Sequence, residues 1–531
     1  MTLAASPPTA ASRATWACLA LLALDACSAS PDRAADAASA TDTTSATDAT
    51  LPELAASAEV QLGASFTIQH GRFAFLQGVD CAKAGNCYGN NPSSPYGLLL
   101  VPPAPGRPLP PEPIITTDAG GAQCYGQAGC APALTGSFML AADEVVVATG
   151  FTPPEVAYWG MTSYVYSRVR DGARDPVFAS LGDSTNLATW RSPTGSSFEA
   201  PFVVLLGANP ATLATAQAAF TAAGVDSRAI LTLTIPGGTD TSAFTFGDDP
   251  AAAIELTFLL RSAVPRDEAA FAAYIDPVAV ARRFSVLRLT PLTPVGAAPQ
   301  PWPSERTRGS GDGEGTALRD GLDQLARAVK KVALDDGMPV ELASALTWAA
   351  VGEPIYEGGK YCYDNAKDCL GDSPDALYSI TTTAMPLAAD GSTYDVAIGV
   401  NHSATGKAAY TNVSVTEISP PTLAAATAAD ASFGGSAAYY FAQAGIAIDP
   451  AVAAQLYAIR FSWHCGGASY CVDLTEAAMA AGVWSGDPPT ESWSLSPDDP
   501  LNVTERAYLD LITGTGPSHD QLISPRVIYV H

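Results

Sequence analysis

The most constraining feature of this chain is the spacing of its cysteines. Eight of the ten form four close pairs, which are Cys81/Cys87, Cys124/Cys130, Cys362/Cys369 and Cys465/Cys471. Pairs at this spacing in an exported chain predict local disulfides made in an oxidising compartment. Disulfides that close short loops hold those loops without joining distant elements, so we expect the hydrophobic cores to do most of the folding.

The N-terminus carries the features of an export signal. An apolar run from Trp16 to Ala26 follows Arg13, and it is too short to span a bilayer as a helix. The run ends in Leu24-Asp25-Ala26-Cys27, which resembles the bacterial lipobox, where an apolar and a small residue precede a cysteine that becomes lipidated. Asp25 departs from the small or apolar residue usual at its position. The resemblance implies that residues 1–27 are a signal peptide and that Cys27 carries a lipid, and simple secretion is the alternative.

Residues 28–57 consist almost entirely of Ala, Ser, Thr and Asp. Such a segment buries too little surface to offset its ordering entropy, so we expect a disordered tether behind the anchor. A second long apolar segment does not follow, so the expected contact with the membrane is through the lipid alone. Together these features imply an exported lipoprotein of the outer membrane, the periplasm or the cell surface.

The charge balance excludes one class of partner. The chain has 53 acidic and 27 basic residues, which give a net charge of −26 without a basic patch. An acidic surface repels phosphate backbones, so nucleic-acid binding is not expected. Most acidic residues stand singly in turns, which favours an ordinary soluble surface over an acidic binding face.

The remainder is too long for one ordinary core and predicts two domains, 58–290 and 317–531, on either side of a Pro/Gly/Ser-rich linker at 291–316. Each domain contains two of the cysteine pairs. The segment Cys87–Tyr96 aligns without gaps to Cys369–Tyr378, with Cys, Gly, Pro and Tyr at matching positions. We therefore take as a hypothesis that the second domain is a distant repeat of the first.

The fold class that the pattern predicts is α/β or α+β, with mixed sheets, flanking helices and loops closed by disulfides. In the clearest strand–helix–strand unit, Asn209 is a good N-cap, Pro210 suits the first turn, and Gly224 suits the residue after the helix. The first domain should also contain a helix near 267–274 and strands at 66–76, 144–148, 177–181, 202–206, 230–235, 254–260 and 284–289.

The second domain opens with a helix expected at 317–334. Its apolar residues recur at helical spacing and form one stripe, which is typical of a core-facing helix: Leu318, Leu322, Leu325, Val329 and Val332. Strands are expected at 394–400, 457–461 and 527–530, and a further helix at 503–512.

The densest cluster of hydrogen-bonding and titratable side chains follows the expected strand 394–400. It contains Asn401, His402, Ser403 and Lys407, in which His402 would serve as the general base of an exported hydrolase. The glycines of this segment are spaced too far apart for a phosphate loop. A structural turn at the end of a strand is the alternative interpretation.

Gly182-Asp183-Ser184 also follows an expected strand, and it resembles the nucleophile motif of GDSL-type esterases. That family supplies its histidine from an Asp-x-x-His sequence, and none of the five histidines here has an aspartate three residues before it. Ser184 is therefore a weaker nucleophile candidate, with a structural Asp-Ser turn as the alternative.

No metal site and no cofactor is expected. The cysteine spacings in an exported chain disfavour zinc, and the Asp/Gly-rich turns lack the ligand spacing of a calcium loop. The lipobox-like end, the tether and the segment Asn91–Tyr96 resemble bacterial lipoproteins and secreted envelope proteins of unassigned activity. That resemblance implies a binding or structural role with an unknown ligand or envelope partner. The hydrolase near Asn401, His402 and Lys407 is the alternative, so enzymatic activity is undecided.

Overall fold

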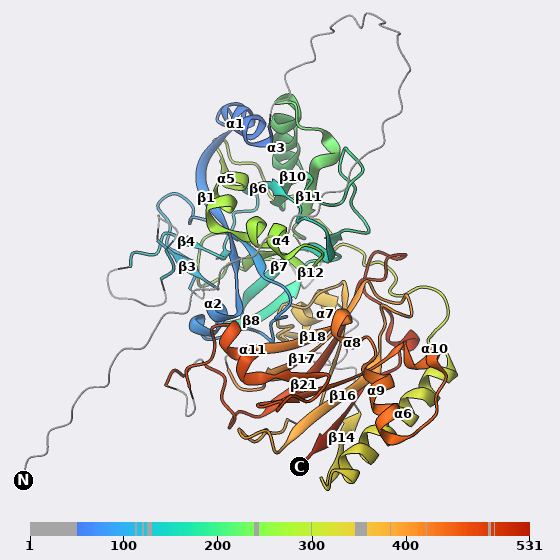
Figure 1. Ribbon diagram of the computed structural model, residues 1–531. Helices are drawn as coiled ribbons and strands as arrows, with labels where there is room; N and C mark the ends of the chain where they lie inside the picture. Colours follow the sequence, from blue (N-terminus) through green and yellow to red (C-terminus); the bar gives the residue numbers. More distant parts are fainter. Residues whose placement is uncertain are drawn as a thin grey trace, which may run out of the picture. The chain divides into compact units, whose positions relative to one another are not determined.

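Strands on the two sides of the 291–316 segment form different sheets in the computed structural model of the chain (Figure 1). The structure describes residues 50–111, 114–118, 122–124, 130–237, 244–298, 300–345, 358–382, 384–420, 422–486, 490–492 and 494–531. These ranges belong to one compact unit that begins at Ala49. The expected signal peptide, the lipidation site Cys27 and most of the expected tether lie outside the described residues. Residues 51–291 are called the first half below, and residues 316–531 the second half.

The first half supplies the largest sheet. Its main strands follow the order β11-β10-β6-β13-β1-β2-β12-β7-β8. Neighbours are antiparallel except β10 and β11, which are parallel. The bounds are β1 (Phe66–Leu76), β2 (Tyr96–Leu100), β6 (Val145–Phe151), β7 (Val156–Arg170), β8 (Ala173–Ser180), β10 (Pro201–Gly207), β11 (Ile230–Thr234), β12 (Glu255–Pro265) and β13 (Ser285–Pro291). The short strands are β3 (Thr116–Thr117), β4 (Leu134–Thr135), β5 (Ser137–Phe138) and β9 (Thr185–Asn186).

The second half supplies two smaller sheets. One has the order β14-β22-β16-β19-β20, in which only β19 and β20 are parallel, and the other has the order β15-β21-β17-β18. The bounds are β14 (Val340–Ala345), β15 (Ala376–Ile380), β16 (Tyr394–Val400), β17 (Tyr410–Glu417), β18 (Ala424–Ala429), β19 (Leu456–Ser462), β20 (Cys471–Asp473), β21 (Leu501–Tyr508) and β22 (Arg526–Val530).

The two halves share one strand order. Taken along the chain, β1, β2, β6, β7, β8, β10, β11, β12 and β13 correspond in turn to β14 through β22. Every pairing in the two smaller sheets then has a counterpart of the same direction in the large sheet. The pairing of β1 with β2 has no such counterpart among the described residues. The duplication itself stays a prediction, but the shared order defines equivalent positions in the two halves.

The longest helices of each half cover one face of its sheet, and shorter helices pack on the opposite face (Figure 1). In the first half, α1 (Leu51–Leu62) and α3 (Pro210–Ala222) pack together, and their apolar side chains join those of β6, β10 and β13 in one core cluster. In the second half, α6 (Thr316–Asp335) and α9 (Ser436–Ala444) do the same over β16, β19 and β22. The shorter helices are α2 (Gly78–Ala84), α4 (Glu268–Ile275), α5 (Pro277–Arg283), α7 (Gly358–Asn365), α8 (Asp430–Phe433), α10 (Pro450–Ala453) and α11 (Leu474–Ala480).

Local signals account for the helices that the sequence predicts. The side chain of Asn209 accepts hydrogen bonds from the backbone of Ala211 and Thr212, and Pro210 opens α3. Gly224 lies beyond the helix with a φ of +100°, a conformation that glycine adopts without strain. The parallel unit β10–α3–β11 is therefore confirmed. In α6 the predicted apolar stripe faces the core, as expected.

The helix expected at 503–512 is wrong, because residues 501–508 form the central strand β21. Val503 and Glu505 face the core of the second half, whereas Thr504 and Arg506 face the opposite way. Both faces of this strand are buried, and each carries a charged residue. The alternation of apolar and polar residues, the usual signal of a strand, holds over Leu501–Thr504 and is broken by Glu505 and Arg506.

The expected tether also ends too late, because residues 51–57 belong to α1. Thr50 and Glu53 form a capping box, and Pro52 lies in the first turn. Leu51, at the start of the helix, is buried in the core. The sequence Thr-Leu-Pro-Glu is the local signal for this helix start.

The four expected disulfides are present among the described residues. Cys81–Cys87 closes the loop after α2, and Cys362–Cys369 closes the equivalent loop after α7. Cys124–Cys130 lies between β3 and β4, and Cys465–Cys471 links the loop after β19 to the start of β20. Because β19 and β20 correspond to β10 and β11, these two disulfides are not at equivalent positions. A mixed α/β fold with several sheets and short disulfide-closed loops is thus confirmed.

The loop that follows Cys87 docks on the second half. The Gly89 N–H donates to the Thr422 carbonyl at 2.9 Å. Asn90 exchanges two hydrogen bonds with the backbone of Ala424, at 3.0 and 2.8 Å. Thr422 and Ala424 belong to the hairpin of β17 and β18, so a first-half loop covers a second-half hairpin.

The equivalent loop after Cys369 docks on the first half in the same way. The Gly371 N–H donates to the Phe178 carbonyl at 2.8 Å. Asp372 accepts hydrogen bonds from the backbone and the hydroxyl of Ser180, at 2.8 and 2.7 Å. Phe178 and Ser180 belong to β8, which is equivalent to β18, so the two halves exchange corresponding loops.

These loops generate a paired stability prediction. Gly89 and Gly371 both have left-handed backbones, with φ of +61° and +69°. A Cβ atom on Gly371 would lie 2.8 Å from the Phe178 ring, whereas the nearest atom to one on Gly89 is 4.0 Å away. We expect Gly89→Ala to cost about 1–2 kcal/mol of unfolding free energy for the backbone alone. Gly371→Ala should cost about 1–3 kcal/mol more through the clash. Urea denaturation checks this, and equal losses would contradict the loop geometry.

Candidate functional site

A cavity of about 440 Å³ lies where the two halves meet. One wall comes from β2, β8 and β12 of the first half, and the other from β15, β17 and β21 of the second half. The two exchanged loops and residues 305–308 contribute to the rest of the lining, with residues of α2 and Ile114 and Ile115. Two of the strands in each wall, β2 and β12 in one and β15 and β21 in the other, are equivalent in the two halves.

Much of this lining is apolar. Leu76, Leu98 and Leu259 contribute from the first sheet, Phe178 from β8, and Ile380 from β15. A few polar groups converge on the same space, which is the usual composition of a small-molecule site. These polar groups include an arginine and a tyrosine from neighbouring strands of each wall.

Each wall presents an arginine over a tyrosine. Arg261 of β12 lies opposite Tyr96 of β2, with its guanidinium 5.6 Å from the ring centroid. Arg506 of β21 lies opposite Tyr378 of β15 at 5.9 Å. The four residues occupy equivalent positions in the two halves, and all four line the cavity.

The same arginines hold the exchanged loops. Arg261 donates to the carbonyl of Gly371 at 2.6 Å and to the hydroxyl of Tyr164. Arg506 donates to the carbonyl of Gly89 at 2.8 Å and to the hydroxyl of Ser414. Each arginine therefore binds the loop of the opposite half, and the acceptors are neutral groups.

Acidic side chains gather at one end of the cavity. Glu305 lies there with an exposed side chain, beside Asp183 and Asp372. Partial desolvation and the negative charges of Asp372 and Asp183 raise the pKa of Glu305 to about 7, against the opposing charge of Arg308. Burial also raises the pKa of Asp372, although its hydrogen bonds to Ser180 act in the other direction.

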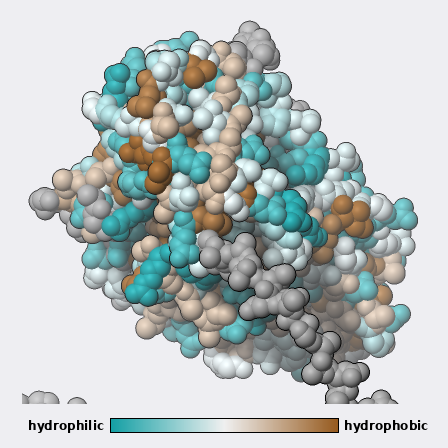
Figure 2. Space-filling view, turned by 90° about the horizontal axis from the view of Figure 1, so that it is seen from above, coloured by the Kyte–Doolittle hydropathy of each residue, from teal (hydrophilic) through white to brown (hydrophobic). Residues whose placement is uncertain are grey.

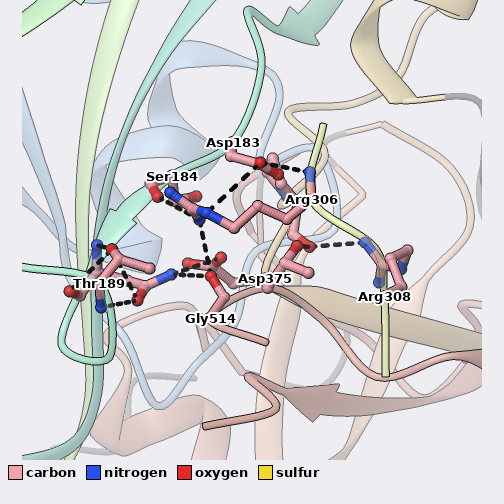
Figure 3. A network of polar contacts seen from close by, with 10 residues as sticks. Asp183, Ser184, Thr189, Arg306, Arg308, Asp375 and Gly514 are labelled. Carbon is pink, nitrogen blue, oxygen red and sulfur yellow. Dashed lines mark hydrogen bonds and ion pairs between the residues drawn. The ribbon is translucent and has the colours of Figure 1, made fainter. Parts of the chain in front are cut away.

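The 291–316 segment is held between the halves by its arginines (Figure 3). The Arg306 backbone N–H donates to Asp183 at 2.7 Å, and its guanidinium donates to the carbonyl of Gly514 at 2.8 Å. Arg308 donates to the carbonyl of Pro374 at 2.6 Å. Asp375, in the same network, accepts from Asn186 of the first half at 2.9 Å. This segment therefore forms part of the cavity wall.

Ser184, a nucleophile candidate from the sequence, belongs to this network and does not line the cavity. Its side chain is fully buried, and its hydroxyl pairs with that of Thr162 at 2.7 Å. The structure therefore supports the Asp-Ser turn at this position.

His402 lies outside the cavity and is fully buried. Its Nδ1 lies 2.8 Å from a carboxylate oxygen of Glu314, and its Nε2 lies 3.4 Å from one of Glu505. Burial alone would lower the pKa of His402, but the two carboxylates outweigh it and raise the pKa to about 10. A charged ring bonded at both nitrogens cannot accept a proton, so the geometry does not support a hydrolase based on His402.

The neighbouring candidates hold the same turn. The side-chain oxygen of Asn401 accepts from the hydroxyl of Ser403 at 2.6 Å. Lys407 donates to the carbonyl of Ser310 at 2.9 Å. With Glu314 on His402, this cluster fastens residues 310–314 to the second half. It acts as a structural turn.

Sequence reasoning missed the residues of the cavity. Tyr96 and Tyr378 belong to the repeated segment, which is the signal that marks them as equivalent. Arg261 directly follows an expected apolar strand, and Arg506 lies within the segment taken for a helix. Among the described residues there is no cluster of His, Cys, Asp and Glu fit to hold a metal ion.

The comparisons with known proteins leave the family open. No family model and no curated protein matches the chain. A solved structure from Vibrio parahaemolyticus is similar at 12% identity, with a TM-score of 0.32 over 75% of this chain and 88% of the other. An uncharacterised protein from Burkholderia cenocepacia is similar at 12% identity, with a TM-score of 0.34 over 92% of this chain and 91% of the other. Likeness at this level carries no argument about function.

The buried bridge of Glu314, His402 and Glu505 yields a stability prediction. His402→Gln leaves two buried carboxylates without their cation, so we expect a loss of about 3–5 kcal/mol in unfolding free energy. Lys407→Met, in the same turn, removes one hydrogen bond and should cost about 1 kcal/mol. Urea denaturation of both variants tests this, and a loss no greater than that of Lys407→Met would argue against a charged bridge.

The same bridge gives a pH dependence of known sign. The pKa of His402 rises from its ordinary 6.5 to about 10 on folding. The stability that the bridge contributes is therefore fully present below pH 6.5 and is lost as the pH rises towards 10. We expect the stability difference between the wild type and His402→Gln to shrink across this range. A constant difference would show that the ring is neutral.

Proposed function

We propose that this is an exported binding protein whose ligand occupies the cavity between the two halves. The observation that carries the proposal is the construction of the cavity: apolar walls from two different sheets surround a few convergent polar groups. The polar groups are held in place by hydrogen bonds to the exchanged loops, so the site is formed before a ligand arrives.

The outer surface offers less to a ligand of this kind. On the face drawn in Figure 2, hydrophobic residues appear as separate small groups among hydrophilic ones. The cavity, by contrast, is lined by apolar side chains from both halves. A small molecule with an apolar body therefore gains more by entering the cavity than by binding this surface.

Binding to the cavity is tested with the neutral fluorescent probe N-phenyl-1-naphthylamine. We expect saturable fluorescence enhancement with the purified protein. Ile380→Trp adds an indole to the lining and should weaken binding at least about tenfold, because lost apolar space of this size is worth about 1.4 kcal/mol or more. Ile512→Trp is the matched control, since Ile512 is 83% exposed. Absence of binding, or equal effects of the two substitutions, would overturn the proposal.

We also propose export, with a lipid on Cys27. Local disulfides in the described residues support an oxidising compartment. No helix in the part of the chain that the structure describes is long and apolar enough to cross a membrane.

The anchor is tested by cell fractionation. Cys27→Ser should move the protein from the membrane fraction to the soluble fraction, because a single thioether lipid would be its attachment. Cys18→Ser changes a cysteine inside the expected signal peptide and should leave the protein membrane-bound. Retention of Cys27→Ser in the membrane fraction would rule out the lipid.

A further inference from the structure

We infer that the ligand of the cavity carries an anionic group, a carboxylate or a phosphate, which Arg261 and Arg506 bind together. The inference rests on the proposed binding function and adds the chemical class of the ligand. It stands on the burial of the two guanidinium groups, on their neutral partners, and on a hydroxyl in the same cavity that has no partner among the described residues.

Both arginines are buried, and no described residue serves as a counter-ion to either. Arg261 is 4% exposed and Arg506 is 3% exposed. Their hydrogen bonds run to carbonyl and hydroxyl oxygens, and neither forms an ion pair with a described residue. Arg288, a comparably buried arginine away from the cavity, lies 2.5 Å from the carboxylate of Glu144. Burying a cation without an anion carries a large desolvation penalty. Binding of an anion from solution would offset that penalty.

The two guanidinium groups also retain donors. Arg261 uses one N–H on each terminal nitrogen in the bonds to Tyr164 and Gly371. A guanidinium has more N–H groups than these, arranged in a fork that matches carboxylate and phosphate oxygens. Arg506 stands at the equivalent position of the opposite wall. The two arginines therefore line one cavity from opposite walls.

A third polar group points to the same ligand. Thr416 of β17 lines the cavity and is 6% exposed, and its hydroxyl oxygen has no hydrogen-bond partner among the described residues. A buried hydroxyl without a partner costs free energy that a bound acceptor would recover. A ligand with an oxygen on this side of the cavity would accept from it.

The acidic side chains that line the cavity do not prevent an anion from binding at the two arginines. Asp372, whose charge reaches Arg261, is bonded to Ser180 at the docking site of the loop. Burial and the charge of Asp499 raise the pKa of Glu417 to about 7, and Glu305 is raised similarly. These two side chains are thus partly neutral near pH 7, while the arginines remain charged.

The expected ligand therefore has an apolar body and one anionic end. Octanoate, octyl phosphate and octan-1-ol share the same chain and differ only in the polar end, so isothermal titration calorimetry with these three probes isolates the anion. We expect one or both anions to bind the wild type at least about tenfold more tightly than the alcohol. The tighter of the two anions identifies a carboxylate or a phosphate as the recognised group.

Substitutions assign the effect to the arginines. Arg261→Met and Arg506→Met should each weaken binding of the anion about 10- to 100-fold and weaken binding of octan-1-ol much less. Arg168→Met is the control, because Arg168 is a buried arginine that stacks on Tyr363 at 4.5 Å and does not line the cavity. Circular dichroism confirms folding. If either methionine variant fails to fold, Arg261→Lys and Arg506→Lys keep the charge without the fork and should weaken the anion selectively.

The outcomes separate the two proposals. Equal affinity for the anions and the alcohol, or no anion binding by a wild type that binds N-phenyl-1-naphthylamine, would overturn the anionic ligand and leave the binding function intact. Selective loss in Arg168→Met as large as that in Arg261→Met would also overturn it. Failure of the wild type to bind any of the four probes would overturn the binding function itself.

Discussion

The structure depends on a reciprocal contact, in which an arginine from the centre of each sheet binds the backbone of a loop from the other half. Arg261 reaches the carbonyl of Gly371, and Arg506 reaches that of Gly89. Each loop makes this contact from a left-handed turn at its glycine, and a disulfide fixes where the loop begins. The two short loops therefore add reciprocal contacts to the core that the halves share around Tyr158, Tyr410 and Tyr508.

The cavity is a consequence of this exchange. Because each loop covers a hairpin of the opposite half, the loops hold the two walls together at their edges. The centres of the walls, where Arg261 and Arg506 lie, remain apart and enclose space. The backbone carbonyls of Gly371 and Gly89 accept hydrogen bonds from the two arginines but carry no negative charge. The contacts between the halves therefore leave the positive charges of Arg261 and Arg506 uncompensated.

Local features were predictable from the sequence, and the site was not. Asn209 and Gly224 mark the ends of α3 because a cap acts on the adjacent backbone. The role of His402 is decided by Glu314 and Glu505, which are 88 and 103 positions away. Arg261 and Arg506 bind carbonyls 110 and 417 positions away. Chemistry of this kind has no local pattern, although the repeated segments around Tyr96 and Tyr378 pointed to the right loops.

Strand β21 was predicted to be a helix, and its residue Arg506 was missed as part of the cavity. Both errors have the same cause. Glu505 and Arg506 are neighbours, so in a strand they point to opposite faces. Glu505 completes the bridge to His402 that fastens residues 310–314, while Arg506 faces the cavity. A shift of the register of β21 by one residue would turn Arg506 towards His402 and Glu505 towards the cavity. The register of this strand therefore fixes both the anchored segment and the proposed binding site, and the adjacent opposite charges of Glu505 and Arg506 are what specify it.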